Sequence, residues 1–133
     1  MIETPLKKVL IVDDDEIDLK KMGQIFEQKG VDVSYANNGK EAVLWLKKNG
    51  NHKLDAIISD VIMPEMNGIE LSHHVGGAYP VILVSKEGEL PFLSEEYLDL
   101  IQAYIDKSDL EHMLFSATIK AVQRFDDEIS VAA

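Results

Sequence analysis

Three short apolar runs, with no polar alternation, constrain the fold of this chain most strongly. They occupy residues 9–12, 56–58 and 81–84. A strand with one face in water alternates apolar and polar residues, whereas these runs suit strands that are buried on both faces, as in a parallel sheet covered by helices. Two weaker candidates, residues 31–35 and 103–106, bring the number of expected strands to five.

Helical patterns with capping signals lie between the expected strands. An Asn or Ser followed three residues later by Glu is the signature of a capping box at a helix start. Asp15 is expected to be either the cap of the first helix or an acid in its first turn, and Ser94 could cap a helix over residues 95–102. The three pairs that match the capping box are Asn38 with Glu41, Asn67 with Glu70, and Ser108 with Glu111.

The resulting order, βαβαβαβαβα, predicts an α/β fold with a five-stranded parallel sheet flanked by five helices. The elements fill residues 1–133 as a single domain, with a core from about residue 8 to residue 125. The last eight residues, 126–133, are expected to fray beyond the final helix.

Composition excludes several function classes. The formal net charge is −11, with 24 acidic against 13 basic side chains, and this balance argues against nucleic acid as a partner. Cysteine is absent, so disulfides and thiolate metal sites are excluded. The first residues have no signal-peptide pattern, and the apolar runs are too short to cross a membrane. We therefore expect a cytoplasmic protein.

Polar side chains follow four of the five expected strands. Asp13 and Asp14 come after the first strand, Asp60 after the third, Ser85 after the fourth and Lys107 after the fifth. In an open α/β sheet, ligands bind beside the carboxyl ends of the strands. These five side chains are therefore expected to share one crevice.

The chemistry of such a group is coherent. Several carboxylates in one crevice repel each other unless a proton or a cation sits among them, and oxygen ligands without His or Cys favour Mg²⁺. A carboxylate beside that ion can attack a phosphoryl group and form an aspartyl phosphate. The metal, a lysine and a hydroxyl can stabilise the transferring oxygens. Asp60, Lys107 and Ser85 can fill these protein roles.

Four motifs in a fixed order then point to a known family. The chain resembles the receiver domain of two-component response regulators, the CheY-like group with a flavodoxin-like sheet of strand order 2-1-3-4-5. The resemblance covers the chain from residue 8 to about residue 125. The matching segments are VLIVDDDE at 9–16, SDVIMPEMNG at 59–68, PVILVS at 80–85 and YIDK at 104–107.

The resemblance implies a role for each site residue. Asp60 looks like the phosphoacceptor, supplied by a sensor histidine kinase or a histidine phosphotransfer protein. Asp14 would bind Mg²⁺ directly and Asp13 mostly through water, with the backbone carbonyl of Ile62 as a further ligand. Lys107 would pair with the phosphoryl group.

A switch is implied as well. Ser85 would move toward the phosphoryl group and draw Tyr104 from an outward to an inward rotamer. The chain would then signal to a separate downstream target protein, without being an enzyme beyond its own phosphorylation and dephosphorylation. Ile62 is apolar at a position where fast-cycling members carry a polar residue, so slow self-dephosphorylation is the hypothesis.

The chain departs from the family pattern at several positions. Lys86 stands where the family has Ala or Gly, and it could narrow access to Asp60 or help to hold a phosphodonor. Ser108 replaces the usual Pro, so a trans Lys107–Ser108 bond is expected. Asp106 could pair with Lys107. Pro91 delays the following helix and leaves residues 92–93 either as an apolar docking patch or folded onto the core.

Two other functions remain open from the sequence. The departures at Lys86, Asp106 and Ser108 would also suit a pseudo-receiver that signals by protein contact without phosphorylation. The DxD in residues 13–15 would suit a haloacid-dehalogenase-type phosphatase, although Glu16 and Ile17 do not match that pattern and SDVIMPEMNG would be unexplained.

Overall fold

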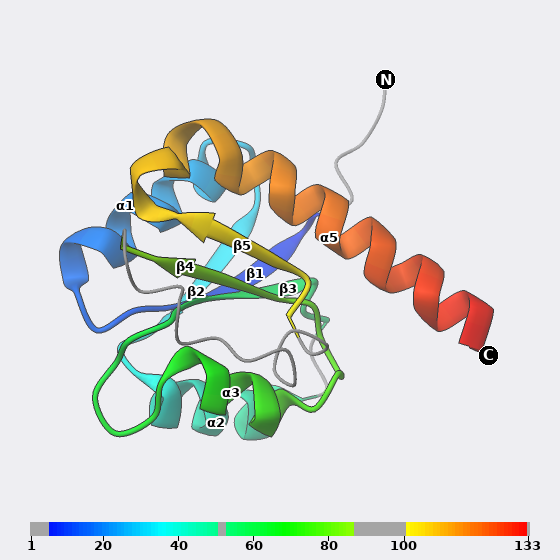
Figure 1. Cartoon of the computed structure of the whole chain (residues 1–133), viewed down its shortest axis with the longest axis horizontal. Helices are drawn as coiled ribbons and strands as arrows, with labels where there is room; N and C mark the ends of the chain where they lie inside the picture. Colours follow the sequence, from blue (N-terminus) through cyan, green and yellow to red (C-terminus); the bar gives the residue numbers. More distant parts are fainter. Residues whose placement is uncertain (1–5, 51–52, 87–100, 133) are drawn as a thin grey trace.

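The computed structural model describes residues 6–50, 53–86 and 101–132 of the chain, with side chains to residue 128. Five parallel strands form one sheet in the order β2-β1-β3-β4-β5 (Figure 1). The predicted α/β fold and strand order are therefore confirmed. The strands are β1 (Lys8–Val12), β2 (Asp32–Ala36), β3 (Ala56–Asp60), β4 (Val81–Ser85) and β5 (Ala103–Asp106).

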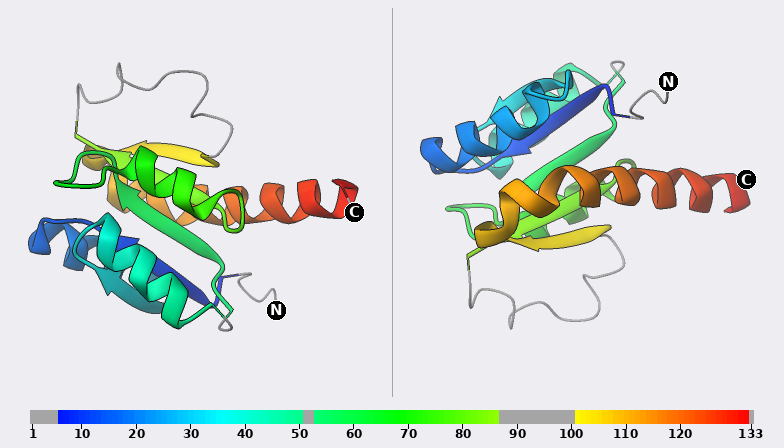
Figure 2. Two further views of the ribbon diagram at one scale, coloured as in Figure 1. Left: turned by 90° about the horizontal axis from the view of Figure 1, so that it is seen from below. Right: turned by 90° about the horizontal axis from the view of Figure 1, so that it is seen from above.

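Helices cover both faces of the sheet. In Figures 1 and 2, α1 and α5 lie on one face, and α2 and α3 lie on the other. The helix predicted over residues 95–102, its cap Ser94 and the apolar residues 92–93 fall outside the described residues. The described helices are α1 (Glu16–Glu27), α2 (Gly39–Lys48), α3 (Gly68–Val75) and α5 (Leu110–Ala132), with a short 3₁₀ turn, η2 (Lys107–Asp109).

The central strands are buried on both faces because their side chains alternate between two hydrophobic cores. In β1, Val9 and Ile11 pack under α1 and α5, where Phe26 and Leu114 also lie. The intervening side chains, such as Leu10, pack on the opposite side under α2 and α3. This two-sided burial is the physical basis of the unalternating runs in the sequence. It also fixes the strand ends that carry the polar residues.

Local capping signals were predictive where both partners are close in sequence. Asn67 and Glu70 form the expected reciprocal capping box at the start of α3. Asn38 accepts a hydrogen bond from the backbone N–H of Glu41, but the Glu41 carboxylate accepts from Asn37 instead of completing the box. Asp15 caps α1, which is one of the two roles expected for it.

Two predictions about the last helix are wrong. Ser108 does not start this helix but lies inside η2, the turn before it, and Asp106 caps that turn: its carboxylate accepts hydrogen bonds from the backbone N–H and the hydroxyl of Ser108. The residues expected to fray instead continue α5 to Ala132, since no Gly or Pro interrupts the helix after Leu110. Figure 2 shows the end of α5 extending beyond the sheet.

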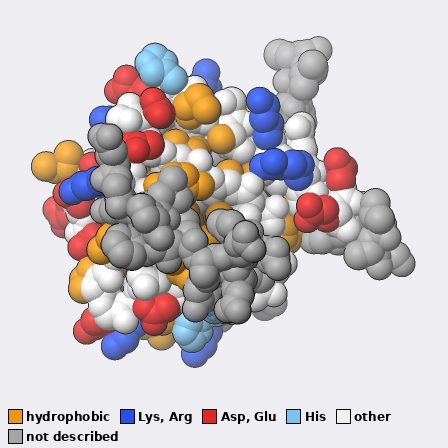
Figure 3. All heavy atoms as spheres, viewed as in Figure 1, with side chains coloured by type: hydrophobic (Ala, Val, Ile, Leu, Met, Phe, Trp, Pro, Cys, Tyr) orange, Lys and Arg blue, Asp and Glu red, His pale blue; other side chains and the backbone are white. Residues whose placement is uncertain are grey.

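Surface charge is mixed on the face shown in Figure 3, where acidic and basic side chains are interspersed. Within residues 6–50, 53–86 and 101–132, no helix combines the length and apolar character that crossing a bilayer requires.

Candidate functional site

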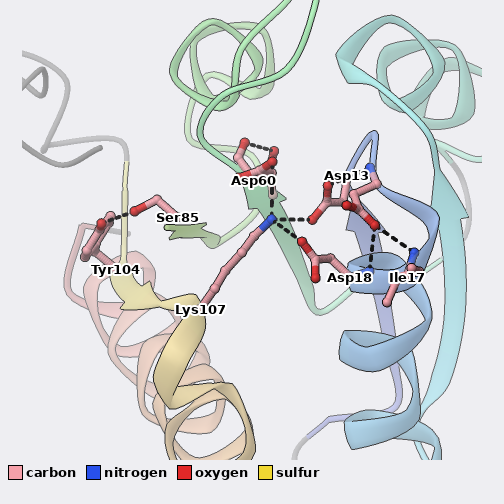
Figure 4. A network of polar contacts seen from close by, with 9 residues as sticks. Asp13, Ile17, Asp18, Asp60, Ser85, Tyr104 and Lys107 are labelled. Carbon is pink, nitrogen blue, oxygen red and sulfur yellow. Dashed lines mark hydrogen bonds and ion pairs between the residues drawn. The ribbon is translucent and has the colours of Figure 1, made fainter. Parts of the chain in front are cut away.

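The polar residues singled out from the sequence meet at the carboxyl edge of the sheet (Figure 4). Asp60 is the last residue of β3 and Ser85 the last of β4, while Asp13 follows β1 and Lys107 follows β5. Parallel strands place their carboxyl ends on one edge, so residues far apart in sequence come together there. The structure brings Asp13, Asp14, Asp60 and Lys107 into one cluster.

Three carboxylates form the acidic part of this cluster. One oxygen from each of Asp13, Asp14 and Asp60 lies within 4.8 Å of the others. Asp13 is fully buried and Asp60 is 6% exposed, whereas Asp14 is exposed. Burial raises the pKa of Asp13, and the hydrogen bond from the backbone N–H of Asp15 only partly opposes this effect.

Lys107 provides the positive charge. Its ammonium donates hydrogen bonds to Asp18 at 2.8 Å and to Asp13 at 3.0 Å, and lies 3.4 Å from a carboxylate oxygen of Asp60. The side chain is only 9% exposed. Burial on its own would lower the pKa of Lys107, but the hydrogen bonds to Asp18 and Asp13 and the charge of Asp60 raise it well above its ordinary value. Lys107 is therefore a permanent cation at this edge.

Asp18 is the site residue that sequence reasoning missed. It lies in the first turn of α1 and makes the shortest ion pair of Lys107. The sequence shows Asp18 only as an acidic residue in the first turn of a helix. Such a residue is favoured by the helix dipole alone, so it does not by itself indicate a site. The expected pairing of Asp106 with Lys107 is wrong, because the Asp106 carboxylate is turned to Ser108 and the Lys107 ammonium to the cluster.

The donor set suits a hard divalent cation. The three clustered side chains offer only carboxylate oxygens, and these ligands favour Mg²⁺ over softer metals. Three negative charges this close are unfavourable unless positive charge offsets them, and one lysine offsets only part. The cluster of Asp13, Asp14 and Asp60 could therefore hold a metal ion. Ile62 lies two residues beyond Asp60, with its side chain 53% exposed.

A pair of hydroxyls lies beside the charged cluster. The hydroxyls of Ser85 and Tyr104 are hydrogen-bonded to each other across β4 and β5 (Figure 4). Ser85 is fully buried, and the Tyr104 ring is half-buried against the core under α2 and α3. The two residues predicted to form the switch are thus in direct contact.

Gly68 determines how closely α3 can approach Asp60. A Cβ at this position would lie 2.3 Å from the backbone oxygen of Asp60, a distance that no side chain tolerates. The Gly68 N–H donates to the carbonyl of Val61 at 2.8 Å, which closes the loop between β3 and α3. This close turn explains why a residue without a side chain is needed there.

Three described residues that depart from the family pattern, Lys86, Asp106 and Ser108, lie near this cluster. Lys86 is exposed next to the site. Hydrogen bonds from the backbone N–H groups of Asp18 and Ile17 lower the pKa of Asp15, and the charges of Lys107 and Lys86 contribute to a smaller extent. The Lys107–Ser108 peptide bond is trans, as predicted.

Comparison with known proteins points to one family. The profile of the response regulator receiver domain matches residues 9–118. The chain is 37% identical over 86 residues to the transcriptional regulatory protein CpxR homolog of Haemophilus influenzae, which covers 63% of this chain and 36% of that protein. It is 37% identical over 99 residues to the autoinducer 1 sensor kinase/phosphatase LuxN of Vibrio campbellii, covering 74% of this chain and 11% of that protein. The chain thus spans only a minor part of these relatives.

A solved structure agrees with the profile. The receiver domain of the Francisella response regulator 1452 superposes with a TM-score of 0.73 at 28% identity, covering 89% of this chain and 98% of that one. The sheet order, the carboxylate cluster after β1 and β3 and the lysine after β5 fit this assignment. The chain belongs to the response regulator receiver domain family.

Proposed function

We propose that this chain is a phosphorylation-controlled switch in which Asp60 is the phosphoacceptor. The observation that carries the proposal is the convergence of three carboxylates with one buried lysine at the carboxyl edge of the sheet. Asp60 is the member of this group that ends β3, and one of its oxygens lies 3.4 Å from the Lys107 ammonium. A nucleophile needs such a cation beside it when it accepts an anionic group.

The proposed reaction transfers a phosphoryl group from a phosphohistidine of a partner protein to an oxygen of Asp60. The P–N bond to the histidine breaks, a P–O bond to the carboxylate forms, and the imidazole leaves. Sensor histidine kinases and histidine phosphotransfer proteins are the partner class with this chemistry, and a sensor kinase is among the relatives of this chain. In this reaction Lys107 would bind the transferred oxygens and offset their charge.

Asp13, Asp14, Asp60 and the backbone carbonyl of Ile62 are the proposed holders of Mg²⁺. When bound, Mg²⁺ would neutralise part of the negative charge that the incoming phosphoryl group adds to the cluster. The close approach of the three carboxylates supports this assignment. Asp13 is the most buried of the three, and one of its oxygens already accepts a hydrogen bond from the backbone N–H of Asp15, which suits an indirect contact through water.

The hydroxyl pair of Ser85 and Tyr104 is the proposed link to a downstream target protein. A phosphoryl oxygen on Asp60 would compete with Tyr104 for the Ser85 hydroxyl. Because Tyr104 is half-buried on the last strand of the sheet, a change in its partner would alter the surface near β5. The target protein would read that surface.

The test is the intact mass of the protein after incubation with acetyl phosphate and Mg²⁺. One added phosphoryl group is expected for the wild type, and none after EDTA treatment or in Asp60→Asn. Asp126→Asn makes the same chemical change on the exposed part of α5 and should label like the wild type. Labelling of Asp60→Asn equal to that of Asp126→Asn would overturn the assignment. Failure of every variant to label, and of the wild type to bind beryllofluoride, would favour a pseudo-receiver.

Slow loss of the phosphoryl group is a second consequence. The apolar and exposed Ile62 offers no hydrogen bond to a water attacking the phosphoryl group. Ile62→Asn should therefore shorten the lifetime of the phosphorylated form, measured by the decay of the labelled mass after removal of donor. Decay of the wild type within seconds would contradict this hypothesis.

A further inference from the structure

Asp18 faces Lys107 from the first turn of α1, and the mechanism proposed above gives it no role. Its carboxylate lies 2.8 Å from the Lys107 ammonium, nearer than Asp13 at 3.0 Å and clearly nearer than Asp60 at 3.4 Å. The contacts to Asp18 and Asp13 are hydrogen bonds, whereas the distance to Asp60 exceeds the usual hydrogen-bond range. The ammonium is thus drawn toward α1 and away from the phosphoacceptor.

The position of Asp18 is fixed by the start of its helix. Asp15 caps α1 and accepts hydrogen bonds from the backbone N–H groups of Ile17 and Asp18. The Asp18 side chain is 22% exposed, so its ion pair with the 9% exposed Lys107 is partly shielded from solvent. An ion pair with this degree of burial is stronger than one on the open surface.

Phosphorylation of Asp60 would give the Lys107 ammonium new hydrogen-bond acceptors. An ammonium has three N–H donors, and in this structure two of them are taken by carboxylates of the α1 side. To direct more than its one remaining N–H at phosphoryl oxygens on Asp60, the ammonium has to give up or lengthen one of these two contacts. Asp13 would meanwhile face the metal, which leaves Asp18 as the carboxylate that competes for Lys107.

We propose that Asp18 is a competing counter-ion for Lys107, a positioning residue that lowers the affinity of the site for a phosphoryl group. It holds the cation on α1 in the resting protein and so favours the unphosphorylated form. This inference rests on the proposed phosphoacceptor role of Asp60. It gives α1 a part in setting the phosphorylation equilibrium.

The test uses beryllofluoride as a phosphoryl mimic at a fixed, saturating concentration of Mg²⁺, with its Kd measured by calorimetry. Asp18→Asn should bind about tenfold more tightly, because a partly buried ion pair no longer has to be broken. Glu16→Gln removes the same charge from the same helical turn at an exposed position and should stay within about twofold of the wild type. Asp18→Glu keeps the charge and should restore weak binding.

A double-mutant cycle with Lys107→Gln separates the effect of the Asp18–Lys107 ion pair from the general effect of a negative charge near the site. In the Lys107→Gln background, Asp18→Asn should no longer tighten binding, since the cation for which it competes is gone. In Mg²⁺-free protein the urea midpoints of the two single variants and the double variant should be non-additive as well. Asp18→Ser repeats both measurements if the amide variant folds poorly.

Several results would overturn the inference. Equal tightening in Asp18→Asn and Glu16→Gln would mean a general charge effect, and weaker binding in Asp18→Asn would mean that Asp18 helps Lys107 rather than competes. Tightening that persists in the Lys107→Gln background would also refute it. If the wild type neither binds beryllofluoride nor accepts a phosphoryl group, the proposed function fails first. Wild-type binding that Asp18→Asn leaves unchanged refutes only the role of Asp18.

Discussion

The two halves of the carboxyl edge use different chemistry. The charged half contains the clustered carboxylates of Asp13, Asp14 and Asp60 after β1 and β3. The Lys107 ammonium contacts two of these, Asp13 and Asp60, together with Asp18 of α1. The hydroxyl half, at the ends of β4 and β5, consists of Ser85 and Tyr104, which are neutral and hydrogen-bonded to each other. Removing the lysine from the first half leaves buried carboxylates without their counter-ion, whereas removing a hydroxyl from the second leaves one polar group without its partner. The two halves should therefore differ in the size of their responses to substitution.

Lys107→Met should have the largest effect on stability. It leaves the fully buried Asp13 without its counter-ion, so the free energy of unfolding in Mg²⁺-free buffer should fall by about 3 kcal/mol. Added Mg²⁺ should recover part of this loss. Urea unfolding with and without Mg²⁺ measures both effects, and Lys120→Met, an exposed lysine on α5, is the control. Equal stability of the two variants would remove the main contrast between the halves.

Gly68→Ala tests the backbone that supports the charged half. The new Cβ would press on the backbone oxygen of Asp60 at 2.3 Å, so the loop has to shift at a cost of about 2 kcal/mol. Thermal or urea unfolding gives the loss, and Gly50→Ala is the control because its Cβ meets a backbone oxygen at 3.2 Å. Similar losses in both variants would show that the approach of α3 to Asp60 is not tight.

Tyr104→Phe probes the hydroxyl half. The buried Ser85 hydroxyl would lose its partner, and the free energy of unfolding should fall by about 1 kcal/mol. Tyr79→Phe removes a hydroxyl from another half-buried tyrosine of the same core. A loss for Tyr104→Phe that approaches the effect of Lys107→Met would contradict the division into a charged and a neutral half.

Tyr35 is a hydroxyl that, unlike those of Ser85 and Tyr104, donates its hydrogen bond to a carboxylate. Its titration therefore compares a charged with a neutral partner for a hydroxyl, and it has the smallest expected effect. Burial, and then the Glu27 carboxylate that accepts its hydrogen bond, raise the pKa of Tyr35 to about 12. Because the unfolded chain ionises near pH 10, the stability contributed by the neutral phenol is present below pH 10 and is lost as the pH rises toward 12. Phenolate absorbance, with Tyr35→Phe to assign the signal, measures the pKa. Titration of Tyr35 near pH 10 would refute the shift.

The sequence predicted the fold, and the meeting of Asp13, Asp14, Asp60 and Lys107 at one edge of the sheet, because the signals for both are local. The runs that form β1, β3 and β4 are apolar on both faces, and each polar site residue directly ends or follows a strand. The box of Asn67 and Glu70 was predictable for the same reason, since its two partners are three residues apart.

The features that were missed depend on packing between distant segments. Asp18 reaches Lys107 across 89 residues, and the packing of α1 against α5 on the same face of the sheet brings them together. Asp106 had two possible partners, Ser108 and Lys107, and in the structure its carboxylate accepts hydrogen bonds from Ser108. The Lys107 ammonium is already surrounded by three other carboxylates. Neither choice is encoded in the spacing of the residues.

The central claim, that Asp60 is the phosphoacceptor, is tested most directly by locating the acyl phosphate. Borohydride reduces an aspartyl phosphate to homoserine, and peptide mass spectrometry after labelling with acetyl phosphate and Mg²⁺ identifies the reduced residue. The account predicts homoserine at position 60 alone, and none when EDTA is present. Homoserine at position 13 or 14, or an unmodified peptide around Asp60 in a labelled protein, would contradict it.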